Sequence, residues 1–256
     1  AYAKDRKQFG KAIIEFPAVY DMLSTIKAKL DAGRALLYQT ARYVDIYKAL
    51  DDIARERKLT PEERQEQKRY AKLADSFTPL AKGMNSEYAN QNAYDCIQVH
   101  GGSGFMMEYA CQRIYRDARI TSIYEGTTQL QTVAAIRYVT NGAYAATLHE
   151  YEMVPCAPEY EGYMDRIKNM TRKFEACTNA VKEAQNQELL DLVARRLYEM
   201  AAVCVMSHLL LQDATKAPEM FGKSLNVYVN YAEAEIEKHF NFIRKFQAEE
   251  LESYRK

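Results

Sequence analysis

Apolar residues recur at intervals of three and four along most of the chain, whereas the alternation typical of β-strands is nearly absent. This spacing gives an α-helix one apolar face, which the helix buries against its neighbours. Only ten glycines and six prolines interrupt the pattern. The pattern therefore predicts an all-α protein, whose first long helix runs from Pro17 to about residue 58.

Capping residues and prolines predict further helix boundaries. Thr60 is followed by a proline and two acidic residues, a combination that is typical of a helix start. Thr78–Pro79 repeats part of this pattern, so the helix should kink or restart there before glycines end it near His100. We expect a short helix at about 109–118 and another that runs from Ser122 to Thr140.

The segment Val154–Gly162 contains two prolines and no helical stripe, which makes it the best candidate for a domain boundary. Three further helices are expected beyond it, and the middle one contains the apolar run at 200–214. The chain should therefore form two helical bundles in tandem, at residues 1–150 and 151–256.

The charge balance and the cysteines narrow the possible functions. The counts of Lys+Arg and Asp+Glu are both 35, which gives no support for binding nucleic acid or an anionic membrane. No apolar run approaches the ~20 residues of a membrane-spanning helix. Five cysteines without CxxC spacing indicate reduced thiols and a cytoplasmic protein. The four histidines form no ligand pair, so no metal site is expected.

The first polar motif is the stretch DRKQFG at Asp5–Gly10. Arg6 offers a planar cation suited to a diphosphate, Gln8 can hydrogen-bond a nucleotide, and Phe9 can pack against an aromatic ring. The alternative is a basic helix end that is closed by Gly10 as a C-cap. Because the chain opens on what resembles the end of a helix, we expect it to be part of a longer protein.

The second motif is the stretch QVHGGSGF at Gln98–Phe105. Three glycines in four residues allow backbone N–H groups to approach an anion closely. The alternative is a flexible turn between two helices. A dinucleotide-binding loop of the Rossmann type is disfavoured because no strand precedes these glycines.

The third motif is the stretch IYEGTTQLQ at Ile123–Gln131. Ser122 and Glu125 have the spacing of a capping box, in which the carboxylate folds back onto the backbone amide of the N-cap residue. Glu125 could equally serve as a catalytic base, with Gly126 leaving room for a substrate beside it. The residues of the motif alone leave both interpretations open.

Taken in order, the three motifs closely resemble the C-terminal helical domain of flavin-dependent acyl-CoA dehydrogenases, over about residues 1–145. Residues after about 155 resemble an extra helical domain of one bacterial branch, which includes dehydrogenases proposed to act on methylthio-substituted propionyl-CoA. The resemblance implies a four-helix up-down bundle, with FAD held between it and a central β domain that this chain lacks.

The resemblance also implies a role for individual residues. Glu125 matches the base that removes the α-proton of the substrate. The glycine-rich loop matches one that contacts flavin across a dimer interface. The positions that match FAD contacts are Arg6, Gln8, Phe9, Gln98, Gly101, Gly102, Thr127 and Gln129. The positions that match the lining of the acyl-thioester site are Tyr124 and Gly126.

The implied reaction is α,β-dehydrogenation of an acyl-CoA, with hydride transfer to FAD. The implied partners are the acyl-CoA substrate, electron-transfer flavoprotein as electron acceptor, and further copies of the chain in a dimer or tetramer. The chain alone is expected to be inactive, because it lacks the other domains of the family.

Three other functions are an acyl-CoA oxidase, a helical interaction domain and a metal-binding bundle. An acyl-CoA oxidase would pass electrons to O₂, and this chain alone does not separate it from a dehydrogenase. A non-catalytic helical interaction domain is disfavoured by the neutral charge and by the presence of Glu125. A ferritin-like metal bundle requires Glu-x-x-His pairs, and the spacing at Glu237–His239 is wrong for one.

Overall fold

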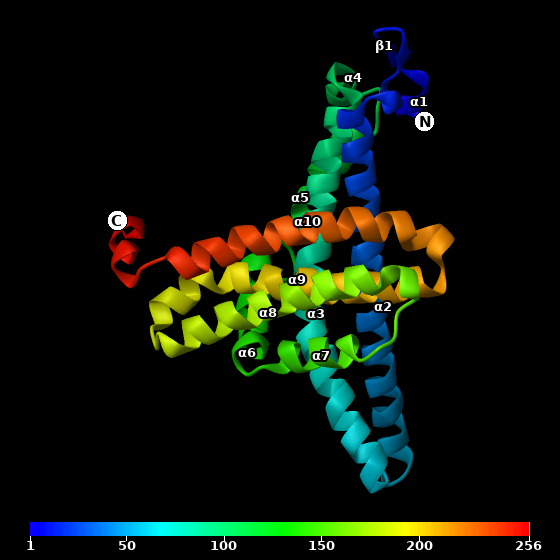
Figure 1. Ribbon diagram of the computed structural model, residues 1–256. Helices are drawn as coiled ribbons and strands as arrows, with labels where there is room; N and C mark the ends of the chain where they lie inside the picture. The colour runs from blue at the N-terminus through cyan, green and yellow to red at the C-terminus, as the bar shows by residue number, and fades with distance from the viewer. Residues whose placement is uncertain (256) are drawn as a thin grey trace.

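The computed structural model describes residues 1–255 and is almost entirely helical, which confirms the all-α prediction (Figure 1). Two long helices, α2 (Pro17–Glu56) and α3 (Pro61–His100), form an antiparallel hairpin. The remaining elements are α1 (Tyr2–Asp5), β1 (Lys7–Gln8), β2 (Lys11–Ala12), η1 (Ile13–Glu15), α4 (Gly102–Phe105), α5 (Cys111–Thr121), α6 (Thr128–Thr140), α7 (Ala143–Glu152), η2 (Pro158–Tyr160), α8 (Glu161–Glu183), α9 (Gln187–Lys216), α10 (Pro218–Lys245) and η3 (Ala248–Tyr254).

The turn of the long hairpin confirms the predicted helix start at Thr60. The hydroxyl of Thr60 accepts a hydrogen bond from the amide of Glu63 at 3.2 Å, and the Glu63 carboxylate accepts one from the Thr60 amide at 2.9 Å. Two backbone donors that the helix leaves free are thereby satisfied. The Arg57 guanidinium, hydrogen-bonded to Glu63, lowers the pKa of that carboxyl to about 2.

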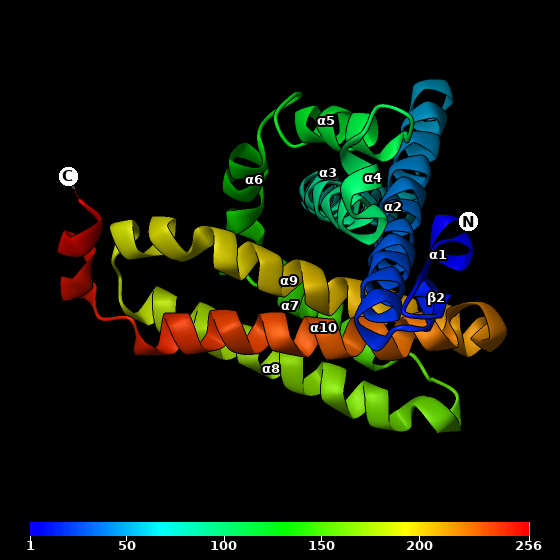
Figure 2. The same cartoon turned by 90° about the horizontal axis from the view of Figure 1, so that it is seen from above.

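A second layer, formed by α8, α9 and α10, runs across the hairpin (Figures 1 and 2). Helix α9 is central because it packs against α2, α3 and α6 as well as α8 and α10. Its predicted apolar run is buried throughout 200–211. One continuous hydrophobic cluster includes Leu36 of α2, Phe77 of α3 and Tyr228 of α10. The division at residue 150 stays a prediction, and the two segments share one core.

Helix α3 passes through Pro79 without a break, so of the predicted kink or restart at Thr78–Pro79 the restart is wrong, while the kink stays a prediction. The Thr78 hydroxyl donates to the carbonyl of Ala74 at 2.7 Å instead of capping a new helix. The hydroxyl of Tyr198, from α9, donates to the Pro79 carbonyl at 3.0 Å. Tertiary packing around the proline therefore outweighs its local tendency to end the helix.

The residues around Gly10 form a β-hairpin, which corrects the interpretation of Gly10 as a helix C-cap. Lys7 pairs with Ala12, and Gln8 pairs with Lys11. The turn between them has positive φ at both Phe9 (49°) and Gly10 (83°). Two successive left-handed residues are the geometry of a tight two-residue hairpin turn, which glycine favours.

Candidate functional site

The turn that carries Glu125 spans Ser122–Thr127, between α5 and α6, and we call it the Glu125 turn. Helix α6 begins at Thr128, with Thr127 as its N-cap: the Thr127 hydroxyl accepts from the amide of Leu130 at 3.3 Å. The predicted helix start at Ser122 is therefore wrong. Positive φ angles at Glu125 (52°) and Gly126 (91°) separate the two helices.

The predicted capping box between Ser122 and Glu125 does not form. Ser122 is instead the C-terminal cap of α5, and its side chain is buried. It accepts a hydrogen bond from the guanidinium of Arg119 and donates one to the Arg119 carbonyl. The capping interpretation of Glu125 is thus excluded by the local geometry, since α6 starts three residues after the carboxylate.

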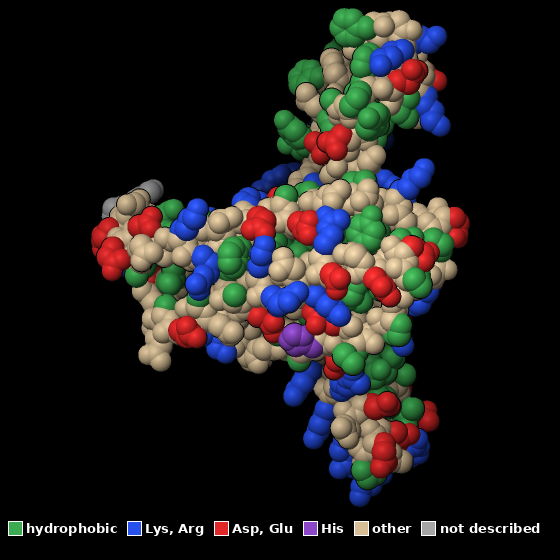
Figure 3. All heavy atoms as spheres, in the orientation of Figure 1, with side chains coloured by type: hydrophobic (Ala, Val, Ile, Leu, Met, Phe, Trp, Pro, Cys, Tyr) green, Lys and Arg blue, Asp and Glu red, His purple; other side chains and the backbone are tan. Residues whose placement is uncertain are grey.

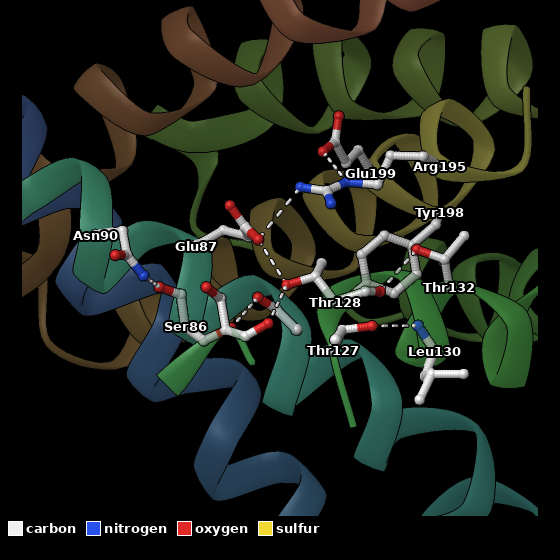
Figure 4. A network of polar contacts seen from close by, with 12 residues as sticks. Ser86, Glu87, Asn90, Thr127, Thr128, Leu130, Thr132, Arg195, Tyr198 and Glu199 are labelled. Carbon is white, nitrogen blue, oxygen red and sulfur yellow. Dashed lines mark hydrogen bonds and ion pairs between the residues drawn. The ribbon is translucent and has the colours of Figure 1, made fainter. Parts of the chain in front are cut away.

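Side chains from α3 and α6 hold the Glu125 turn in place. The ammonium of Lys82 donates to the carbonyl of Gly126, and the side-chain amide of Gln131 donates to the carbonyl of Glu125 at 3.3 Å. The Thr128 hydroxyl donates to a carboxylate oxygen of Glu87 at 2.6 Å (Figure 4). A non-glycine residue with positive φ costs conformational free energy, so it persists only where surrounding contacts such as these hold it in place.

Glu125 lines a cavity of about 650 Å³ that lies between α2, α3 and the Glu125 turn. We call it the Glu125 cavity. Most of its lining surface is apolar and includes Leu30, Leu37 and Ala81. Lys82, Tyr124 and Glu125 also line it. The side chain of Glu125 is exposed, so the carboxylate is accessible to a molecule in the cavity.

A second cavity, of about 510 Å³, brings together the first two sequence motifs. We call it the N-terminal cavity. Its lining includes Arg6, Gln8, Phe9, Gln98, Gly101 and Gly102. The two motifs meet because Tyr2 donates from its hydroxyl to the carbonyl of His100 at 3.1 Å and stacks on the His100 ring at 4.4 Å.

The N-terminal cavity has features that suit a phosphorylated ligand. Gly101 has a φ of 59°, and neither Gly101 nor Gly102 has an atom within 4 Å of where a Cβ would lie. Open space beside both glycines leaves their backbone accessible to an anion. Phe9 is 93% exposed, so its ring is free to contact a planar group.

The two cavities are lined by different levels of α3: residues between 78 and 92 line the Glu125 cavity, and residues 98–100 line the N-terminal cavity. Lys82, beside Gly126, and Gln98 are separated by sixteen residues of α3, or about 24 Å along a helix. Thr127, the N-cap of α6, and Gln129, in its first turn, are exposed and line neither cavity. The predicted site residues therefore fall into two groups within one chain.

The end of the molecule that carries α1, β1 and α4 has hydrophobic side chains on its surface, together with lysines and arginines (Figure 3). Phe105 and Met107 are 81% and 88% exposed. Acidic side chains also lie at this end, and positive and negative side chains are interspersed over α8 and α10 (Figure 3). Apolar side chains gathered at one end are typical of a surface that another protein element covers.

The sequence motifs did not indicate a third cavity, of about 680 Å³, which lies between α3, α5, α9 and α10. Lys29, at its wall, is only 6% exposed; its ammonium donates to the side chain of Gln91 at 2.8 Å and lies 4.4 Å from the Tyr231 ring centroid. Burial lowers the pKa of Lys29. A lysine one helical turn after the apolar Ile26 is a feature of the sequence that could have indicated this site.

The described residues contain neither a candidate membrane-spanning helix nor a candidate metal site. Within residues 1–255, no helix combines the length and apolar character needed to cross a membrane. The same residues contain no group of three or more histidine, cysteine, aspartate or glutamate side chains arranged to hold a metal ion.

Two family models match consecutive parts of the chain. The model described as "Acyl-CoA dehydrogenase, C-terminal domain" matches residues 1–139. The model described as "Acyl-CoA dehydrogenase C terminal" matches residues 140–251. Together they account for nearly the whole sequence.

Among curated proteins, subunit CarC of the caffeyl-CoA reductase–Etf complex of Acetobacterium woodii is 36% identical over 130 residues, or 51% of this chain. The 3-(aryl)acrylate reductase of Clostridium sporogenes is 33% identical over 130 residues. A probable acyl-CoA dehydrogenase of Mycobacterium tuberculosis is 34% identical over 137 residues, or 54% of this chain. The matches span 28%, 28% and 29% of these three relatives, so most of each relative has no counterpart here.

Solved structures show the same fold. An acyl-CoA dehydrogenase from Bacillus anthracis, complexed with FAD, superposes with a TM-score of 0.72 at 23% identity and covers 99% of this chain and 46% of its own. An acyl-CoA oxidase from Yarrowia lipolytica superposes with a TM-score of 0.70 at 14% identity and covers 98% of this chain and 42% of its own. The fold is therefore common to dehydrogenases and oxidases.

Proposed function

Because the chain belongs to the acyl-CoA dehydrogenase family, we propose that it forms the C-terminal helical part of a flavin-dependent enzyme that oxidises an acyl-CoA thioester. The observation that carries the proposal is the placement of Glu125. Its exposed carboxylate lies on a left-handed turn, beside Gly126, at the wall of an apolar cavity. The chain matches only part of its relatives, so the activity belongs to a larger protein.

Glu125 would act as the general base on the α-carbon of the thioester. A carboxylate oxygen of Glu125 takes up the α-proton while the acyl chain occupies the apolar cavity along α2 and α3. An acyl chain in that cavity displaces water, which strengthens the hydrogen bonds that orient the thioester. The Glu125 carboxylate is not used to cap α6, because Thr127 caps that helix. The carboxylate is therefore free to accept the α-proton.

The residues present fit FAD in two places. Arg6, Gln8, Phe9 and the glycines of the N-terminal cavity would hold a diphosphate and an aromatic ring. Thr127 and Gln129 would contact the cofactor beside Glu125. When bound, FAD supplies the acceptor for the hydrogen that leaves the β-carbon as hydride.

The separation of these two groups supports a homo-oligomer. One FAD next to Glu125 would not also reach the N-terminal cavity of the same chain, about 24 Å further along α3. A second copy that brings its N-terminal cavity to the first copy's cofactor would use both groups. The exposed Phe105 and Met107 suit such an interface.

We further propose electron-transfer flavoprotein as the redox partner. The relative from Acetobacterium woodii is named as a subunit of a complex with Etf. Two relatives are also named as reductases, which favours a second candidate function: the same site could reduce an enoyl-CoA or an arylacrylate derivative. In that direction Glu125 would return the proton to the α-carbon.

The test uses the complete enzyme with its flavin, mixed anaerobically with saturated acyl-CoA esters of different chain length. Bleaching of the oxidised flavin by at least one ester, followed by electron transfer to electron-transfer flavoprotein, is the expected result. Rapid reoxidation by O₂ would instead identify an oxidase. Reduced flavin that is reoxidised by enoyl-CoA, with no bleaching by any saturated ester, would support the reductase. If the complete enzyme purifies without flavin and does not bind added FAD, the dehydrogenase, oxidase and reductase functions are all overturned.

A further inference from the structure

Thr128 is the point at which the Glu125 turn is tied to the rest of the molecule. Its amide donates to the carbonyl of Ser122 at 3.1 Å, which closes the turn. Its hydroxyl donates to the Glu87 carboxylate of α3 at 2.6 Å. Thr128 is 4% exposed and the Glu87 side chain is 26% exposed, so the Thr128 side of this contact is shielded from water.

The neighbours of Thr128 point elsewhere. Thr127 and Gln129, the two residues that would contact the cofactor, are exposed. Successive residues on a helix point in directions about 100° apart, so an inward anchor at 128 leaves both neighbours on the outer side. The placement of Thr128 thus fixes the direction of both neighbours as well as the end of the turn.

Glu87 is itself held by a residue from the second helical segment. The Arg195 guanidinium of α9 lies 3.6 Å from Oε1 of Glu87, the same oxygen that accepts the Thr128 hydroxyl (Figure 4). Arg195 also donates to Glu199 at 2.5 Å, and the other oxygen of Glu199 lies 2.9 Å from Nε2 of His239, in α10. A line of polar contacts therefore runs from α10 to the Glu125 turn.

We propose that Glu87 is a positioning residue for Glu125, and that Arg195 of the second helical segment keeps Glu87 in place. This inference rests on the proposed function, and it gives residues 140–251 a role in that reaction. A partly buried carboxylate needs a partner, and without Arg195 it would turn toward solvent and release Thr128.

The backbone at Glu125 explains why an anchor is needed. A glutamate with a φ of 52° is in a conformation that L-residues rarely adopt. Released from Thr128, the turn would relax toward negative φ and move the carboxylate away from the α-carbon. A displacement of about 1 Å is enough to slow a reaction on the order of 100-fold.

Paired variants distinguish loss of the Thr128–Glu87 hydrogen bond from a change in side-chain size at either position. Thr128→Val removes the hydroxyl and keeps the shape, whereas Thr128→Ser keeps the hydroxyl. Glu87→Ala removes the acceptor of the Thr128 hydrogen bond, whereas Glu87→Gln keeps a side-chain oxygen that can accept this bond. Arg195→Met removes the guanidinium. Arg166→Met is the matched control, because Arg166 forms a comparable pair with Glu233 of α10 but does not contact the Glu125 turn.

The first measurement is the rate of flavin reduction by an acyl-CoA in the complete holoenzyme. Thr128→Val and Glu87→Ala should lower the rate constant by roughly 10- to 100-fold with flavin content and KM within a few-fold of wild type. Thr128→Ser and Glu87→Gln should recover most of the rate, and Arg195→Met should lie between. Arg166→Met should match wild type. Wild-type rates in both Thr128→Val and Glu87→Ala would overturn the proposal.

The second measurement does not depend on the reaction. Hydrogen–deuterium exchange at the Thr128 amide should be faster in Thr128→Val and Glu87→Ala than in their conservative counterparts. Faster exchange with an unchanged reduction rate would also overturn the positioning role. If the wild-type enzyme never reduces its flavin, the proposed function fails, while unchanged exchange in both variants would separately contradict the anchoring of the turn.

Discussion

Substitution of Gly83 by alanine tests the contact between the two helical segments most severely. A Cβ at position 83 of α3 would lie 2.1 Å from the hydroxyl oxygen of Tyr198 and 3.1 Å from its Cζ. Tyr198 is fully buried, and its hydroxyl donates to the Pro79 carbonyl at 3.0 Å. The ring cannot move aside without losing that hydrogen bond or displacing neighbouring helices.

The expected loss of stability combines three effects. Forcing an extra carbon into a packed core costs about 1–3 kcal/mol, and leaving the buried Tyr198 hydroxyl without its acceptor costs about 1–3 kcal/mol. Alanine in place of glycine in a helix recovers about 1 kcal/mol. The net loss is therefore about 3 kcal/mol, which corresponds to a melting temperature lower by roughly 6–12 °C for a chain of this size.

Urea and thermal denaturation of the chain measure this loss, and two variants act as controls. Gly162→Ala lies in α8 with no atom within 4 Å of the new Cβ, so it should raise stability by about 0.5–1 kcal/mol. Tyr198→Phe removes the oxygen that meets the Cβ, so Gly83→Ala should cost less in that background. An unchanged stability of Gly83→Ala, or an equal cost in both backgrounds, would refute the steric argument.

Three further predictions concern histidines and FAD. Burial lowers the pKa of His208 from 6.5 to about 4, so the unfolded chain takes up its proton first as the pH falls. Stability should therefore decrease from about pH 6.5 toward 4, and this decrease should be smaller in His208→Leu, measured by urea denaturation at several pH values. Hydrogen bonds that the His149 ring donates to the carboxylates of Glu175 and Glu152 raise the pKa of His149 above 6.5. The stabilising contribution of His149 is therefore complete below pH 6.5 and is lost as the pH rises through the raised value; His149→Gln should flatten that loss. The chain alone should bind FAD weakly, because in the proposed enzyme it would cover only part of the cofactor; stoichiometric FAD in the purified chain, measured by absorbance, would contradict this.

Local sequence patterns predicted the helices well because most of them are long and have one apolar face. The start at Thr60 was predictable because every capping atom lies within four residues. The start of α6 was not, since Ser122, Thr127 and Thr128 all carry hydroxyls that could cap a helix. Contacts with Lys82 and Glu87 of α3 decide among them, and no local pattern contains those contacts.

The candidate site was predictable to a similar extent. The motifs named Glu125 and the residues that meet in the N-terminal cavity, because each motif is short and distinctive. Glu87 and Arg195 were missed because they lie on separate helices, far apart in the sequence, and each resembles an ordinary surface charge. Gly83 was missed because its requirement comes from Tyr198, a residue of another helix.

The role of Glu125 as the base is tested by flavin reduction by an acyl-CoA in the complete enzyme carrying Glu125→Gln. The amide keeps the size of the side chain but cannot take up the α-proton, and loss of a general base slows a reaction by about 10²–10⁴-fold. Because Thr127 caps α6, flavin content and melting temperature should stay close to wild type. Near-normal flavin reduction in this variant would show that Glu125 is not the base.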